Sequence, residues 1–139
     1  MPQDDFISKI EELAERDGRF KKAAYLFVYD ALEYTVKKLG KAAFQPDQRH
    51  ISGQELLYGI SEYGLEQFGP LTREVFRRWG LDATRNFGEI VFNLIQAGLM
   101  TKTDKDNLDD FTDIYSFPEE FNWKKRKSNY KRLPQQSGT

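Results

Sequence analysis

The chain has 139 residues, a formal net charge of −1 and no cysteine. This length fits one domain with a short tail, and it allows a hydrophobic core without disulfides or a structural metal. The lack of cysteine excludes a disulfide framework, a thiolate metal site and a cysteine nucleophile, and it suits the reducing cytoplasm, where we expect the protein. We see no signal peptide, and no stretch approaches the roughly 20 apolar residues that span a bilayer, so we expect no membrane association.

Helical periodicity predicts two helices in the N-terminal part of the chain. The first covers residues 4–17 and ends before Gly18, and the second covers residues 20–39 and ends before Gly40. The apolar residues of the second helix form a broad stripe. We therefore expect neighbouring elements to cover it on more than one side.

A third helix is predicted from a capping box formed by Ser52 and Glu55, and it ends at Gly69. Two glycines, Gly59 and Gly64, lie inside it. Each weakens a helix by roughly 1 kcal/mol relative to alanine. Close packing against a neighbouring helix is the compensation that we expect at both positions.

Two further helices and a hairpin are predicted next. Pro70 opens a fourth helix that Gly80 ends, and a fifth helix begins near Thr84. The tight glycine-containing turn between them is typical of a helix–turn–helix. Residues 99–103 and 111–117 are rich in Thr, Ile, Tyr and Phe, which predicts a β-hairpin.

The expected fold is therefore mainly α, a five-helix domain with a helix–turn–helix and a C-terminal β-hairpin, similar in shape to a winged helix. We expect one domain over residues 1–121, with an N-terminal helical pair at 1–40 and the helix–turn–helix plus hairpin at 52–117. Residues 122–139 form a basic tail, which we expect to be flexible.

The motifs at residues 49–57, 67–70, 79–80 and 87–94 resemble an uncharacterised family of small bacterial proteins. That family is recorded mainly in the planctomycete and verrucomicrobial group. The resemblance covers roughly residues 20–121, and it implies a bacterial source and a stand-alone domain. It implies no activity and no site residues, and it does not extend to the basic tail.

Catalytic and metal sites are not indicated by the residues present. His50 is the one histidine, and it lies in a loop before a capped helix, where we expect a structural hydrogen bond. Asp104 and Asp106 suggest a calcium loop, but Leu108 and Asp109 stand where another oxygen ligand and a glycine are needed. We therefore expect no enzyme activity and no cofactor.

The fifth helix carries the candidate partner-binding residues on its outer face. Glu89 lies one turn from Arg85, so we expect an ion pair between them rather than a catalytic carboxylate. Arg, Asn and Gln side chains can contact bases, but the acidic residues of the expected wing have the wrong sign for phosphate. Protein contact is favoured, through Arg85, Glu89, Phe92, Asn93 and Gln96.

The basic tail provides the alternative, a nucleic-acid-associated protein. Its cations, beside two aromatic residues, could contact phosphates and stack on bases, or they could only solubilise the chain. The candidate residues are Lys124, Lys125, Arg126, Lys127, Lys131 and Arg132. The favoured function remains a non-catalytic protein-interaction module, with the partner and the oligomeric state undetermined by sequence.

Overall fold

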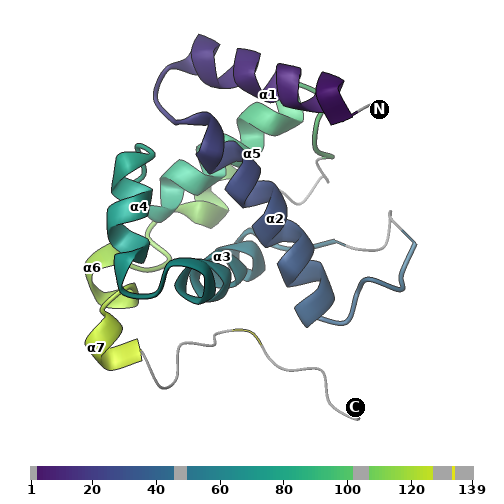
Figure 1. Cartoon of the computed structure of the whole chain (residues 1–139). Coiled ribbons are helices and arrows are strands. Elements are labelled where there is room, and N and C mark those ends of the chain that lie inside the picture. The colour runs from purple at the N-terminus through teal and green to yellow at the C-terminus, as the bar shows by residue number, and fades with distance from the viewer. Residues whose placement is uncertain (1–2, 46–49, 102–106, 127–132, 134–139) are drawn as a thin grey trace.

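The computed structural model describes residues 3–45, 50–101, 107–126 and 133. Figure 1 shows α1 across the top, α2 running diagonally in front of α5, and α3 and α4 below and beside them. Within the described ranges the elements are α1 Gln3–Asp17, α2 Lys22–Lys38, α3 Gly53–Phe68, the 3₁₀ turn η2 Gly69–Leu71, α4 Thr72–Arg78, α5 Thr84–Gln96, the 3₁₀ turn η3 Leu108–Phe111, α6 Phe117–Glu120 and α7 Trp123–Arg126.

The start of α3 forms as its sequence predicts. Ser52 is the N-cap residue, and its Oγ accepts a hydrogen bond from the backbone N–H of Glu55 at 3.0 Å. The Oε1 atom of Glu55 accepts one from the backbone N–H of Ser52 at 2.9 Å. Two of the N–H groups that a helix start leaves unpaired are thereby satisfied.

The two glycines inside α3 allow its neighbours to approach closely, which confirms the predicted packing. A Cβ atom on Gly59 would overlap the Thr35 hydroxyl of α2. A Cβ atom on Gly64 would lie 3.0 Å from Cζ of Phe76 on α4. The missing side chains bring the backbone of α3 against both helices, which offsets the low helix propensity of glycine.

An aromatic core joins these helices. Tyr25, Phe76 and Phe87 are fully buried. The ring of Phe76 packs against that of Phe87 at 5.3 Å between centroids, and against that of Phe121 at the same separation. Edge-to-face pairs of this kind stabilise a core beyond the area that they bury. Residues from α2 to α6 are therefore held around one centre.

The predicted β-hairpin and the winged-helix shape are wrong, because the described residues contain no strand. Instead, Leu108–Phe111 form the 3₁₀ turn η3, and Asn107 is its N-cap residue. The Asn107 side chain accepts a hydrogen bond from the N–H of Asp109 at 2.9 Å, and the Asp110 side chain accepts one from the N–H of Asn107 at 3.2 Å. These side chains supply a helical cap, which competes with strand pairing. Residues 102–106, in the expected hairpin, lie outside the described residues.

The aromatic residues that suggested the second strand instead pack inward from short helical turns. Phe111 packs on Gly53 of α3, where a Cβ would come within 3.0 Å of its ring, and on Gly88 of α5, where a Cβ would lie 2.7 Å from its Cβ and Cγ and collide with it. Pro118 stands in the first turn of α6, a position that helices favour. The aromatic residues of this segment therefore indicated burial in the core, and their presence did not imply a β-strand.

The chain beyond residue 121 remains in contact with the helices where it is described. The Trp123 ring of α7 lies beside Gly69, and Leu133 is buried. The expected flexibility of the tail stays a prediction, since most of residues 127–139 lie outside the described residues. None of the helices in the described ranges is long and apolar enough to cross a membrane.

Candidate functional site

Three of the five predicted partner-binding residues on α5 are half-buried by contacts within the molecule. Arg19 donates from Nη1 to Oε2 of Glu89 at 2.8 Å, and Asn93 donates from Nδ2 to the Tyr25 hydroxyl at 3.0 Å. Phe92 is half-buried against the core. Glu89 therefore pairs with Arg19, and the predicted ion pair with Arg85 is not formed within the described part of the chain.

The remaining two residues of that set are exposed. Arg85 donates from Nη1 to the Thr112 hydroxyl at 3.1 Å, and it lies 3.8 Å from Oδ1 of Asp109. Gln96 lines a hollow at the end of α5. The structure thus does not gather the five residues into one open surface, and their role in binding a partner stays a prediction.

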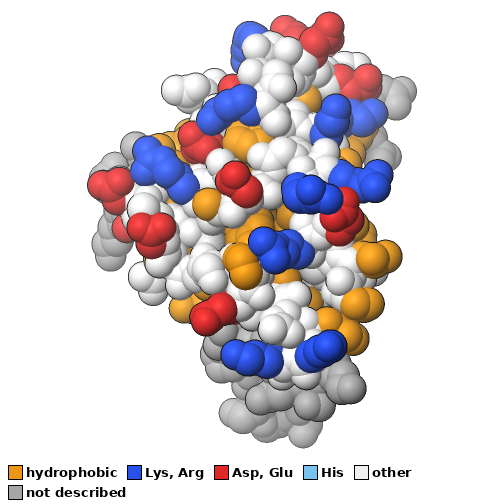
Figure 2. Space-filling view, turned by 90° about the vertical axis from the view of Figure 1, so that its left-hand side faces the viewer, with side chains coloured by type: hydrophobic (Ala, Val, Ile, Leu, Met, Phe, Trp, Pro, Cys, Tyr) orange, Lys and Arg blue, Asp and Glu red, His pale blue; other side chains and the backbone are white. Residues whose placement is uncertain are grey.

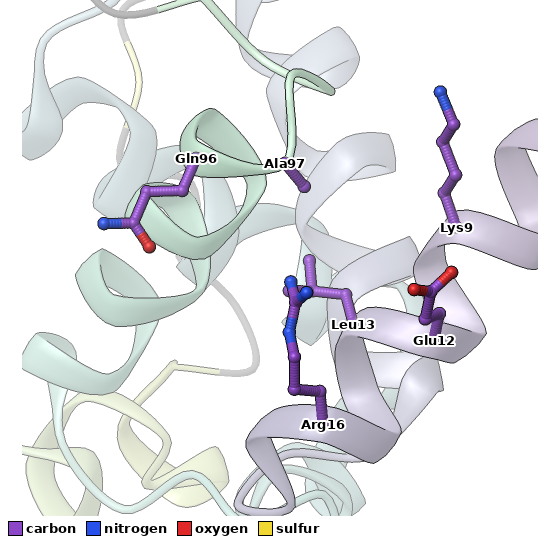
Figure 3. Close-up of a pocket in the computed structure, with 6 residues that line it drawn as sticks. All are labelled: Lys9, Glu12, Leu13, Arg16, Gln96 and Ala97. Carbon is purple, nitrogen blue, oxygen red and sulfur yellow. The ribbon is translucent and has the colours of Figure 1, made fainter.

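The hollow beside Gln96 lies between α1 and the end of α5, and it measures about 260 Å³. Figure 3 shows Lys9 extending away from the other lining residues and the Gln96 amide directed away from α1. Its lining is otherwise Glu12, Leu13, Arg16 and Ala97. Polar groups that do not converge on one point cannot fix a ligand in one orientation.

A second cleft, which we name the aromatic cleft, lies where α2, α3 and the end of α4 meet. It measures about 220 Å³, and its lining contains no Lys or Arg among the described residues. The ring centroids of Phe27 and Tyr63 lie 5.3 Å apart, and those of Phe68 and Trp79 lie 5.7 Å apart. The residues that line it are Ala23, Leu26, Phe27, Asp30, Tyr63, Gln67, Phe68 and Trp79.

The four aromatic rings of the cleft are fixed by their contacts with one another and with the core. Phe27 contacts Tyr63, Phe68 and Trp79, with centroid distances of 5.3, 5.9 and 5.5 Å. It also packs on the buried Phe76 at 5.3 Å. Rings held in this way give a contact surface that loses little side-chain entropy on binding.

Three carboxylates, those of Asp30, Glu33 and Glu66, lie near the α2–α3 end of the aromatic cleft, and Glu33 forms an ion pair with Lys37 at 3.4 Å. Partial burial, and then the charge of Glu33, raise the pKa of Asp30. Burial raises the pKa of the Tyr63 hydroxyl, and the charges of Asp30, Glu66 and Glu33 raise it further. Within the described part of the chain, Asp30 has no hydrogen-bond or ion-pair partner. This end of the cleft therefore favours a cation.

The face of the molecule that carries α4 has a different character. In Figure 2 hydrophobic side chains show at the centre and along the right-hand edge, and Lys and Arg side chains lie between them. On α4, Arg77 and Arg78 donate hydrogen bonds to the Glu74 carboxylate. Arg77 and Arg78 thus share the one carboxylate of Glu74, whereas Asp30 has no ion-pair partner among the residues that the structure describes.

Two buried carboxylates lie on the other side of α3. Glu62 is fully buried, and its carboxylate accepts from the Tyr34 hydroxyl at 2.6 Å and from the backbone N–H of Leu133 at 2.9 Å. Ser61 donates to Oε2 of Glu120 at 2.5 Å, and both residues are buried. Buried polar groups with partners of this kind hold segments in place.

The remaining sequence candidates are placed as follows. The His50 carbonyl oxygen accepts a hydrogen bond from Nζ of Lys41 at 2.6 Å. No group of three or more His, Asp or Glu side chains within the described ranges could hold a metal ion.

Lys124 and Lys125 are exposed on α7, which Arg126 ends. Lys127, Lys131, Arg132, Asp104 and Asp106 lie outside the described residues, so the nucleic-acid alternative stays a prediction.

No protein-family model, curated protein or solved structure matches this chain. The resemblance stated above to a bacterial family therefore stays a prediction as well. The aromatic cleft was missed from sequence because its residues come from three helices. One signal was available, since Phe27 and Asp30 share a face of α2, as Tyr63 and Gln67 share a face of α3.

Proposed function

We propose that the protein is a non-catalytic protein-interaction module that binds a basic segment of a partner protein in the aromatic cleft. The observation that supports this best is the carboxylate of Asp30, which has no hydrogen-bond or ion-pair partner in the described part of the chain, beside Phe27 and the three rings that pack on it. The cytoplasmic location expected from the sequence is part of the same proposal.

The partner's chemistry follows from the lining of the cleft. Aromatic side chains are enriched at protein interfaces, where they provide a large apolar contact area. Asp30 and Glu66 repel an acidic partner and attract a basic one, whereas the charge of Glu33 is offset by its ion pair with Lys37. A segment that alternates basic and apolar residues would satisfy both the rings and the carboxylates.

The aromatic cleft is a better candidate than the outer face of α5. Glu89 and Asn93 use their polar atoms within the molecule, so a partner would have to compete for them. The groups that line the cleft do not have this cost. Gln67 and Asp30 have no hydrogen-bond partner within the described part of the chain.

The test is an NMR titration of the full ¹⁵N-labelled chain with two octapeptides, one of alternating lysine and leucine and one of alternating glutamate and leucine. The indole N–H signal of Trp79, assigned with the variant Trp123→Phe, reports on the cleft. We expect the lysine peptide to shift this signal saturably and the glutamate peptide to leave it unchanged. Equal shifts with both peptides, or none with either, would overturn the proposal.

A pair of matched variants locates the contact on the protein. Gln67→Arg adds a positive charge inside the cleft, whereas Gln54→Arg adds the same charge on an exposed position of the same helix. We expect Gln67→Arg to weaken binding of the lysine peptide and Gln54→Arg to leave it near that of the parent protein. Equal weakening in both variants would show that only net charge matters.

A further inference from the structure

Three polar groups line the aromatic cleft beside its rings, and each can accept a hydrogen bond. They are the carboxylate of Asp30, the amide oxygen of Gln67 and the hydroxyl of Tyr63. Within the described part of the chain, none of them forms a hydrogen bond with another residue. Asp30 and Gln67 are exposed and Tyr63 is half-buried, so water can satisfy these groups in the free protein, and a ligand that displaces this water must donate hydrogen bonds in its place.

The chemistry of the cleft distinguishes among the organic cations. A primary ammonium has three N–H donors on one compact charge, which matches three acceptors, and its alkyl chain can lie on apolar surface. A quaternary ammonium has no donor and would leave the acceptors unpaired. A guanidinium is planar and binds a carboxylate best in a bidentate contact, in which two parallel N–H groups donate to the two carboxylate oxygens. The mixed acceptors here favour the ammonium.

The rings add to this preference. A cation within about 6 Å of an aromatic ring is attracted by the negative face of the ring. The lining contains Phe27, Tyr63, Phe68 and Trp79, and tryptophan is the ring with the strongest attraction. The same rings offer apolar surface to the methylene groups of an alkyl chain.

We propose that the aromatic cleft is a binding site for a single alkylammonium group, of the kind that ends a lysine side chain, with its nitrogen at Asp30 and its carbon chain on the rings of Tyr63 and Trp79. This inference rests on the proposed function, since it names the group of the partner that enters the cleft. The site itself would be present whether or not a protein carries the group.

The test uses small molecules on the full chain, with the Trp79 indole signal as the readout. We expect n-butylammonium to bind in the millimolar range, which is the strength that so few atoms can supply. Butanol, with the same chain and no charge, and tetramethylammonium, with the charge and no N–H donor, should each bind more weakly. Butylguanidinium tests the competing preference for arginine.

Variants identify the carboxylate. Asp30→Asn keeps the shape and removes the charge, and we expect it to weaken butylammonium binding about three- to fivefold, as for a half-exposed ion pair. Glu11→Gln removes a charge from the exposed face of α1 and should leave binding unchanged. Asp30→Glu, which restores the charge, should recover most of the loss.

The outcomes separate this inference from the proposed function. If the lysine peptide binds but butylammonium does not, the ammonium site is wrong and the interaction module stands. The same conclusion follows if the peptide binds and Asp30→Asn binds butylammonium as well as the parent protein does. If butylammonium binds at Asp30 but the peptide does not, the site stands and the proposed function fails. Tighter binding of tetramethylammonium or butylguanidinium than of butylammonium would also overturn the inference.

Discussion

Gly59 of α3 lies so close to Thr35 of α2 that a Cβ atom on the glycine would overlap the threonine Oγ1. The Cβ atom of Thr35 would also lie only 2.9 Å from it. Thr35 is fully buried, and its hydroxyl donates to the carbonyl oxygen of Ala31 at 2.7 Å, so it has no free space into which to move. This contact sets how closely the two helices that frame the aromatic cleft approach each other.

Gly59→Ala should therefore destabilise the protein. Overpacking a core costs about 1–3 kcal/mol, and the roughly 1 kcal/mol gained from the helix propensity of alanine offsets part of it. The free energy of unfolding from urea denaturation should fall by up to about 2 kcal/mol, near the upper end because the overlap with Thr35 is severe. The double variant with Thr35→Ala should lose less than the two single variants added together. A single variant as stable as the parent protein would show that the helices move apart freely.

Gly88→Ala should displace the η3 turn from α5. The added Cβ would lie 2.7 Å from both Cβ and Cγ of Phe111 and 2.9 Å from Cδ1 of Leu108. Overpacking should again cost about 1–3 kcal/mol, and the helix propensity of alanine offsets roughly 1 kcal/mol of it, so we expect the free energy of unfolding to fall by up to about 2 kcal/mol. Ser116→Ala is the control in this region, since Ser116 is exposed and makes no capping hydrogen bond with its side chain. A comparable loss in the control would contradict the explanation.

Stability should fall at alkaline pH through Tyr34. Burial, and then the hydrogen bond and charge of Glu62, raise the pKa of its hydroxyl above the ordinary value near 10.0. The unfolded chain therefore loses this proton first, and the stability present below pH 10 decreases as the pH rises above that value. Urea denaturation at pH 8 and pH 11 should show a smaller loss for Tyr34→Phe than for the parent protein.

The Tyr34→Phe variant should keep part of this alkaline loss of stability. Burial also raises the pKa values of Tyr25 and Tyr29. The informative quantity is thus the difference in slope between the two proteins. If Tyr34→Phe and the parent protein lost stability equally between the two pH values, the buried hydrogen bond would not govern the titration of Tyr34.

The ion pair between Arg19 and Glu89 should contribute to stability at neutral pH and not in acid. Burial opposes ionisation of Glu89, but the hydrogen bonds of Arg19 and Asn86 outweigh it and hold its pKa below the usual value. The contribution is present above the pKa of the unfolded chain and is lost as the pH falls through that of the folded state. Glu89→Gln should cost up to about 1 kcal/mol at pH 7, since Arg19 is half-exposed.

The deficit of the same variant should shrink as the pH falls toward 3, because Glu89 of the parent protein gains its proton in that direction. Measurements at pH 7 and pH 3 provide the comparison. Asp5→Asn is a suitable control, because the Lys9–Asp5 pair is exposed and its closest atoms are 4.0 Å apart. A deficit for Glu89→Gln that persisted at pH 3 would indicate lost packing rather than lost charge.

Predictions that depend on neighbours along the chain were the most successful. The capping box of Ser52 and Glu55, the ends of α1 and α5, and the close packing at Gly59 were all expected from sequence and are present. Caps, glycines and helical periodicity act within one or two turns, so the sequence records them directly. The prediction of a β-hairpin was wrong because it gave more weight to the aromatic pattern than to Asn107 and Pro118, which are residues typical of helix starts.

The candidate site was beyond this kind of reasoning. Phe27 and Asp30 could be assigned to one helix face, but the sequence does not show which helices face each other. The pairing of Glu89 illustrates the same point, because a partner 70 positions away, Arg19, replaced the expected neighbour Arg85.

Local chemistry along the chain thus accounts for the helices, their caps and their mainly α class. Packing between distant segments accounts for the aromatic cleft, for the position of Asp30 in its lining and for the burial of Leu133 against Glu62. The reason is physical, since the free energy of forming a helix turn depends on residues three or four positions apart in the sequence. The free energy of forming a cleft depends instead on which apolar surfaces from distant segments pack together and are removed from water.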